Sequence, residues 1–109
     1  MQKRENRIRM DLSVRVWGMD INGRVFKAQA HTVNITPIGA RIAGIKIELH
    51  RGSIIGVACG SSQARFRVTW IGRTGTGTEG HIGVQCVEPG KYIWGIALKR
   101  NLEQDQVSA

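Results

Sequence analysis

The chain has 109 residues, of which 41% are hydrophobic, and a formal net charge of +8 at pH 7. This length allows one domain with one core, and the composition excludes wholesale disorder. No stretch approaches the roughly 20 apolar residues of a membrane span, and we expect no secretory signal, because no apolar segment follows the charged N-terminus. The excess of Lys and Arg favours anionic partners without choosing among nucleotides, nucleic acid, phosphates and anionic lipid.

We expect residues 1–10 to form a flexible basic arm. Lys3, Arg4, Arg7 and Arg9 lie close together there, with little apolar content around them. Little hydrophobic burial therefore offsets the entropy of ordering the segment, which costs about 1–2 kcal/mol per residue. Such an arm is either solvated or contacts a phosphate.

Six short segments with the patterns of strands follow the arm. Apolar and polar residues alternate over residues 12–17, 26–31, 65–70 and 82–87, and β-branched residues are frequent over 39–45 and 53–59. This period of two, broken by turns at short intervals, predicts antiparallel strands that each bury one face. We therefore expect an all-β fold over residues 11–100, in which six antiparallel strands form a barrel or a sandwich.

The phase of the alternation assigns faces to the aromatic side chains. Phe26, Phe66 and Trp70 share the apolar phase and are predicted to lie in the core, whereas Trp17 has the outward phase. Asn22-Gly23 predicts a tight hairpin, because both residues tolerate a positive φ.

The period changes after Pro89-Gly90. Ile93, Trp94, Ala97 and Leu98 stand at i, i+1, i+4 and i+5. This spacing predicts a short C-terminal helix that lays an apolar stripe on the barrel. Residues 101–109 lack a pattern, and we expect this tail to fray.

We expect neither catalysis nor a metal site. The acidic residues are scattered, and His31, His50 and His81 fall on separate segments without metal-ligand spacing. Cys59 and Cys86 lie in apolar runs and are predicted to be reduced, buried thiols, which favours a cytoplasmic location.

Residues 75–80 spell GxGxxG, the fingerprint of dinucleotide-binding folds. That fingerprint requires the glycines to open a helix, whereas the sequence after residue 80 continues as a strand. We interpret the glycines as a hairpin loop, and we expect no cofactor.

Residues 34–39, Asn-Ile-Thr-Pro-Ile-Gly, allow two interpretations. Asn34 and Thr36 could offer convergent polar groups to a ligand, with Gly39 leaving room for it. Alternatively, Asn and Thr stabilise a turn, Pro sets φ, and Gly takes the left-handed position.

Residues 34–42, Asn-Ile-Thr-Pro-Ile-Gly-Ala-Arg-Ile, resemble the D/N-x-S-x-x-G signature of PilZ domains, with Thr36 in place of Ser. Residues 3–7, Lys-Arg-Glu-Asn-Arg, match the RxxxR motif of that family at Arg7, with Lys3 in place of the first Arg. The likeness extends to about residue 95.

This resemblance implies a six-stranded antiparallel β-barrel of the split-barrel type, whose arm folds over the bacterial second messenger cyclic di-GMP. The ligand-binding residues that it implies are Lys3, Arg4, Arg7, Arg9, Asn34, Thr36 and Gly39. Lys3 offers a point charge where the family uses a bidentate fork, and Thr36 keeps the hydroxyl but adds a methyl group. The implied protein relays the signal to a partner protein and is a monomer or a weak homodimer.

Two alternatives stay open. The chain could be a PilZ-like adaptor that works through protein contacts and has lost nucleotide binding, because Lys3 and Thr36 both depart from the family pattern. A basic barrel that binds nucleic acid is the third interpretation. It needs a continuous basic and aromatic face, which the alternation does not show.

Overall fold

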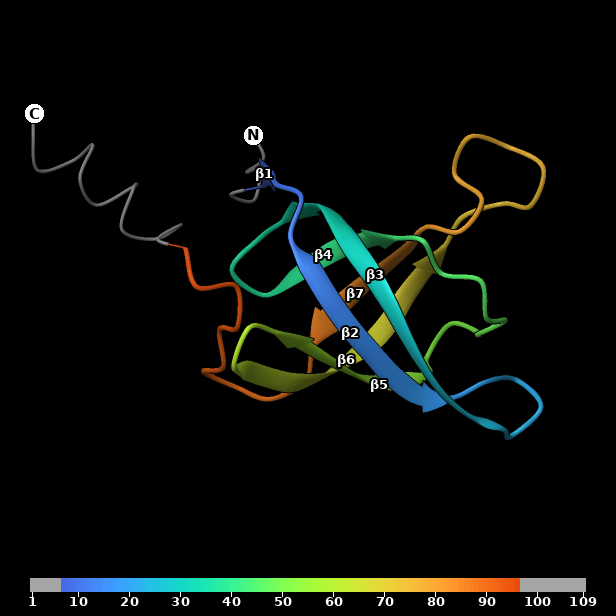
Figure 1. Cartoon of the computed structure of the whole chain (residues 1–109), viewed down its shortest axis with the longest axis horizontal. Helices are drawn as coiled ribbons and strands as arrows, with labels where there is room; N and C mark the ends of the chain where they lie inside the picture. The colour runs from blue at the N-terminus through green and yellow to red at the C-terminus, as the bar shows by residue number, and fades with distance from the viewer. Residues whose placement is uncertain (1–6, 97–109) are drawn as a thin grey trace, which may run out of the picture.

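The computed structural model describes residues 7–96, which form seven strands (Figure 1). In chain order they are β1 (Ile8–Arg9), β2 (Ser13–Met19), β3 (Val25–Ile35), β4 (Gly39–Ala43), β5 (Ile54–Cys59), β6 (Ser62–Ile71) and β7 (Ile82–Cys86). The six segments expected from the period-two pattern correspond to β2–β7. Residues 7–96 include no helix long and apolar enough to cross a membrane.

The sheet closes on itself. Each strand pairs antiparallel with its neighbour in the order β3-β2-β5-β6-β7-β4, and β4 pairs back with β3. The predicted six-stranded antiparallel barrel is therefore confirmed, with β1 as an extra strand. Because Ile8 and Arg9 pair with Ile35 and Asn34 of β3, two residues of the predicted arm form a strand. Lys3 and Arg4 lie outside the described residues.

The inward phases of the strands meet in one core. Its most deeply buried apolar side chains come from all six barrel strands; they are Val14, Val16, Ile35, Ile42, Ile55, Val57, Phe66, Val68 and Ile82. Phe26 is half-buried and packs against this cluster. The buried hydroxyl of Thr32 accepts a hydrogen bond from the N–H of Leu12 and donates one to the carbonyl of Met10, which ties the link before β2 to β3.

The prediction that Trp70 lies in the core is wrong. The register between β6 and β7 shifts between Val68 and Trp70, so Thr69 is an extra residue on β6. Such a bulge reverses the alternation beyond it. Trp70 therefore points outward and is 39% exposed.

The hairpin between β2 and β3 also differs from its prediction in detail. Gly23 has a φ of +80°, but no non-glycine residue between 7 and 96 has a positive φ, Asn22 included. The side chain of Asp20 stabilises the loop instead, since its Oδ1 accepts hydrogen bonds from the N–H groups of Asn22 and Arg24.

The segment after β7 packs on one end of the barrel without regular structure. Residues 91–96 are irregular, so the described part of the predicted helix is not helical. Ile93 and Trp94 are nevertheless buried, and the Trp94 ring lies 5.8 Å from that of Phe66. Ala97, Leu98 and the tail of residues 101–109 lie outside the described residues.

Two valines test this account of the core. Val57 is fully buried, whereas Val25 is 78% exposed. Val57→Ala should lower the free energy of unfolding by about 2–3 kcal/mol through lost burial and a residual cavity. Val25→Ala should change it by less than about 0.5 kcal/mol. Urea denaturation of both variants measures the difference, and equal effects would contradict the assignment of the core.

Candidate ligand-binding site

A pocket of about 430 Å³ opens where the β3–β4 turn faces β6 and β7. This volume lies within the range of small-molecule sites. Its lining residues come from the chain before β1, from the end of β3 and the turn after it, and from β4, β6 and β7; they are Arg7, Asn34, Thr36, Pro37, Ile38, Gly39, Ala40, Thr69, Val84 and Gln85. None of them is acidic.

Thr36 holds the turn in shape. Its Oγ1 accepts hydrogen bonds from the N–H groups of Ile38, at 3.2 Å, and Gly39, at 2.9 Å. The indole N–H of Trp94 donates to the Thr36 carbonyl at 3.1 Å. The backbone interpretation of Thr36 is therefore correct, and its hydroxyl has only its proton left to donate to a ligand.

Gly39 is required by the closure of the barrel. A Cβ at this position would lie 2.2 Å from the carbonyl oxygen of Val84 on β7, a contact that only movement of backbone could relieve. Gly39 does not have a positive φ, so the expected left-handed conformation is not the reason for this glycine. The missing side chain both lets β4 approach β7 and leaves the pocket open.

Asn34 lies between two arginines on the outer face of the sheet. It pairs with Arg9 on β1 and with Arg41 on β4, and directly paired residues project to the same face. Within residues 7–96 its side-chain amide forms no hydrogen bond, and the residue is half-buried. The amide is thus free to bind a ligand at the edge of the pocket.

The same row of the sheet continues to an aromatic platform. Arg41 pairs with Gly83 of β7, and Gly83 pairs with Trp70 of β6. Because Gly83 has no side chain, the Arg41 guanidinium reaches across it and stacks 4.8 Å from the centre of the Trp70 ring. Stacked guanidinium and indole groups form a cation–π pair and present flat surfaces to planar ligands.

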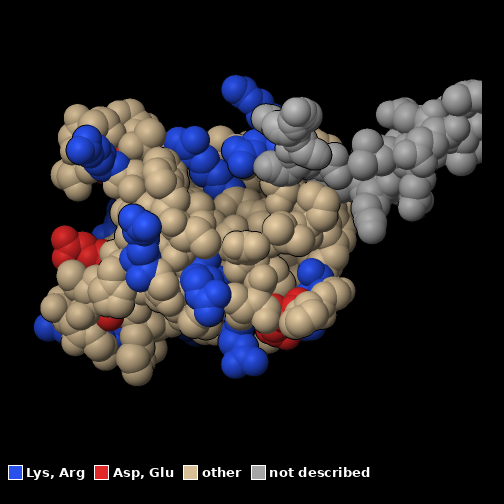
Figure 2. Space-filling model, turned by 180° about the vertical axis from the view of Figure 1, so that it is seen from behind, with Lys and Arg blue, Asp and Glu red and all other residues tan. Residues whose placement is uncertain are grey.

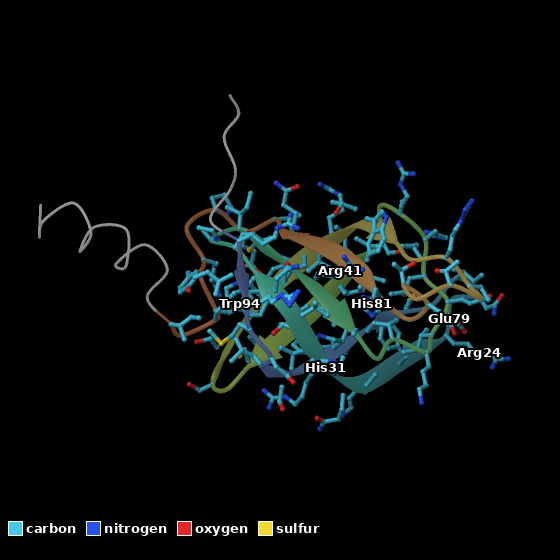
Figure 3. All side chains as sticks on the ribbon, turned by 90° about the horizontal axis from the view of Figure 1, so that it is seen from above. Arg24, His31, Arg41, Glu79, His81 and Trp94 are labelled. Carbon is cyan, nitrogen blue, oxygen red and sulfur yellow. The ribbon has the colours of Figure 1, made fainter. Side chains whose placement is uncertain are left out.

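His81 fixes the position of Arg41. The Arg41 Nε donates a hydrogen bond to His81 Nδ1 at 3.1 Å, and the two side chains lie side by side in Figure 3. Desolvation lowers the pKa of His81, and the positive charge of Arg41 and the proximity of His31 lower it further. Near neutral pH His81 is therefore an uncharged acceptor.

Positive charge dominates the surface. Within residues 7–96, only Arg65 and Lys91 form ion pairs, both with Glu88. The pKa of Glu88 is lowered, chiefly by the hydrogen bond from the Arg65 backbone N–H, so this carboxylate stays charged. Figure 2 shows Lys and Arg spread over the face hidden in Figure 1, with acidic side chains near its margins.

The predicted site residues meet only in part. Arg7, Asn34, Thr36 and Gly39 line one pocket, although Arg7 is far from the others in sequence. Arg9 lies beside Asn34 but does not line the pocket.

Sequence reasoning missed four residues of this region. Thr69 and Gln85 line the pocket, and Arg41 and Trp70 stack beside Asn34. Their proximity depends on the β4–β7 pairing and on the bulge at Thr69, and neither leaves a signal in local sequence.

A second hollow, of about 760 Å³, lies at the other end of β4, between the loops that follow β4 and β6. Its lining mixes Lys46 with Glu48 and Glu79, so it suits an anionic ligand less well than the acid-free pocket does. The GxGxxG segment lies in the second of these loops, as expected. In the part of the chain described, no three His, Cys, Asp or Glu residues are grouped to hold a metal.

No family model, no curated protein and no solved structure matches this chain. The function is therefore argued from the residues and from the geometry of the site.

Gly39→Ala should lower the free energy of unfolding by at least about 2 kcal/mol, since the added Cβ collides with backbone. Gly77→Ala is the matched control, because nothing lies within 4 Å of a Cβ there and its φ is not positive. Urea denaturation compares the two variants. A Gly39→Ala variant as stable as Gly77→Ala would contradict the close approach of β4 and β7.

His81 should make stability depend on pH. Because its pKa is lowered in the folded chain, the unfolded chain binds more protons as the pH falls below about 7. Stability is thus present above the ordinary His pKa of about 6.5 and declines as the pH falls through the folded value. Arg41→Gln should raise the pKa of His81 toward the ordinary value. NMR titration of the His81 imidazole measures its pKa in the parent and in Arg41→Gln. A parent pKa at or above the ordinary value would contradict the arrangement.

Proposed function

We propose that this chain is a PilZ-type receptor that binds cyclic di-GMP in the pocket beside the β3–β4 turn. One observation carries the proposal: residues from two separate motifs, Arg7 on one side and Asn34, Thr36 and Gly39 on the other, line the same acid-free pocket. The closed six-stranded barrel around them is the fold that the resemblance implies.

The chemistry of the ligand suits these residues. Guanine presents its O6 and N7 acceptors to the guanidinium fork of Arg7, and Asn34 can bind the edge of a base. The two phosphodiesters require cations, which Arg9 and the segment containing Lys3 and Arg4 supply.

The Arg41–Trp70 pair adds a stacking surface to this site. It lies in the same row of the sheet as Asn34, and Trp70 is exposed because of the bulge before it. A purine placed at Asn34 could stack on this surface, which stabilises binding without regard to the base's hydrogen-bonding edge. In this proposal the receptor acts in the bacterial cytoplasm, performs no catalysis and passes the signal to a partner protein.

One observation favours the adaptor as a second candidate function. The Thr36 oxygen is occupied by two backbone N–H groups, and Gly39 is required by the backbone of Val84. A PilZ-like adaptor that binds a protein and no nucleotide would therefore still need both residues to form the turn and close the barrel. Arg7 and Asn34 separate the two functions, since no contact within the described fold requires their side chains.

Calorimetric titration with cyclic di-GMP tests the receptor function. Arg7→Ala should weaken binding by roughly 30- to 900-fold, equivalent to about 2–4 kcal/mol, because it removes a charge-assisted donor pair. Lys3→Arg should strengthen binding by about fivefold, since it restores a bidentate fork.

Arg24→Ala is the matched control, because it removes the same charge from the opposite end of β3, where Figure 3 places Arg24. It should leave the affinity unchanged. GMP and cyclic di-AMP serve as control ligands. Absence of binding by the parent, or equal binding by Arg7→Ala, would refute the receptor function and leave the adaptor.

A further inference from the structure

The hairpin between β2 and β3 carries exposed aliphatic side chains at its tip, which projects from the barrel in Figure 1. Met19 and Val25 are a cross-strand pair, and they are 58% and 78% exposed. Ile21, in the loop between them, and Ile54 are 43% and 44% exposed. Ile54 belongs to the same group. Trp17 pairs with Gly56, and continuing this antiparallel register by two residues places Ile54 beside Met19. These four residues are called the apolar tip.

Trp17 forms the next row of the same face. It pairs with Lys27 on β3, and its ring covers Gly56 on β5, where a Cβ would lie 2.2 Å from the ring. Within residues 7–96 the indole N–H forms no hydrogen bond, although the ring is half-buried. Trp17 thus combines an apolar body with a free polar group.

A shallow hollow of about 640 Å³ lies over this row and the next one. Its side chains include Arg15, Trp17, Lys27 and Gln29, and no acidic residue lines it. Arg15 uses one Nη2 hydrogen bond on the carbonyl of Gly60, at 3.2 Å, which leaves its other donors for a ligand. Two cations and an amide beside an indole suit a phosphate group.

The three rows follow one another in a definite order. Successive rows on one face of a strand are about 7 Å apart. The apolar tip comes first, Trp17 and Lys27 follow, and Arg15 and Gln29 come last. This is the order of a membrane surface, where aliphatic groups enter the acyl boundary by about 5–10 Å, indoles lie at headgroup level and cations meet phosphates.

We propose that the tip of the β2–β3 hairpin binds the surface of an anionic membrane, with the apolar tip in the acyl boundary and a lipid phosphate beside Arg15 and Lys27. Asp20 is the one acidic residue in the hairpin. Its carboxylate is engaged within the loop, because it accepts hydrogen bonds from the Asn22 and Arg24 N–H groups at 2.9 Å each. A second copy of the chain suits this face less well, because it would bring like charges together.

The membrane surface is separate from the nucleotide site. Val25 and Asn34 lie at opposite ends of β3, nine residues or about 30 Å apart. Membrane binding therefore does not rest on the proposed function, and both sites can be occupied at once.

Sedimentation with lipid vesicles tests the proposal on the full chain. The parent should bind vesicles of phosphatidylcholine containing about one-third phosphatidylglycerol in dilute salt, and bind phosphatidylcholine alone at least tenfold more weakly. The tryptophan emission should shift to shorter wavelength on binding, and Trp17→Phe should remove most of this shift. Absence of binding to the anionic vesicles overturns the proposal and leaves the face for a protein partner.

Substitutions separate tip insertion from general attraction between a basic protein and anionic lipid. Val25→Glu should weaken vesicle binding at least tenfold while leaving thermal unfolding nearly unchanged, since this side chain is 78% exposed. Ile38→Glu is the matched control, because Ile38 is 58% exposed on the β3–β4 turn at the other end of β3. It should lose at most about threefold through its charge alone.

Lys27→Gln should weaken vesicle binding about fivefold, and Arg9→Gln, which removes a charge beside Asn34 at the opposite end of β3, by clearly less. Equal losses for the tip variant and Ile38→Glu, or for Lys27→Gln and Arg9→Gln, overturn the proposal.

Discussion

The approach of β4 to β7 closes the barrel, and the rest of the structure depends on it. The backbone carbonyl of Val84 occupies the space where any residue but glycine would carry a Cβ at position 39. This contact places the β3–β4 turn against β7, which makes the pocket, and it puts Arg41 next to Gly83. Since Gly83 has no side chain, Arg41 then reaches Trp70, so one backbone approach assembles both the pocket and the stacking surface beside it.

The turn residues serve fold and site together. The hydroxyl oxygen of Thr36 accepts hydrogen bonds from the backbone of the turn. The Thr36 carbonyl accepts one from the indole of Trp94, which covers one end of the core beside Phe66. A ligand at this turn would therefore bind a rigid, preorganised surface, which limits the entropy lost on binding. Arg7 and Asn34 differ from Thr36, because their side chains have no structural partner among residues 7–96. Their chemistry is thus free for a ligand, and their substitution separates binding from folding.

Sequence reasoning identified the six barrel strands because each buries one face, and a period of two is a direct record of that burial. It also singled out Arg7, Asn34, Thr36 and Gly39, which the fold brings to one pocket. It misplaced Trp70, because a bulge at Thr69 changes the phase without any marked residue. It predicted a helix over a segment whose described part, residues 91–96, is irregular. Ile93 and Trp94 are apolar because they are buried at the end of the barrel, and not because they lie on one face of a helix. Thr69, Gln85 and Arg41 could not be found, because non-adjacent strands place them.

The central claim is that the β3–β4 turn, the chain before β1 and the outer row ending at Trp70 form one nucleotide site. An NMR titration of the labelled full chain with cyclic di-GMP tests it most directly. We predict that the largest amide shifts fall at residues 7–9, 34–41, 69–70 and 83–85, that the Trp70 indole resonance moves with them, and that the tip of the β2–β3 hairpin stays unperturbed. Saturating ligand that leaves these amides unchanged, or that shifts chiefly residues 44–49 and 72–81 around the other hollow, would contradict the account.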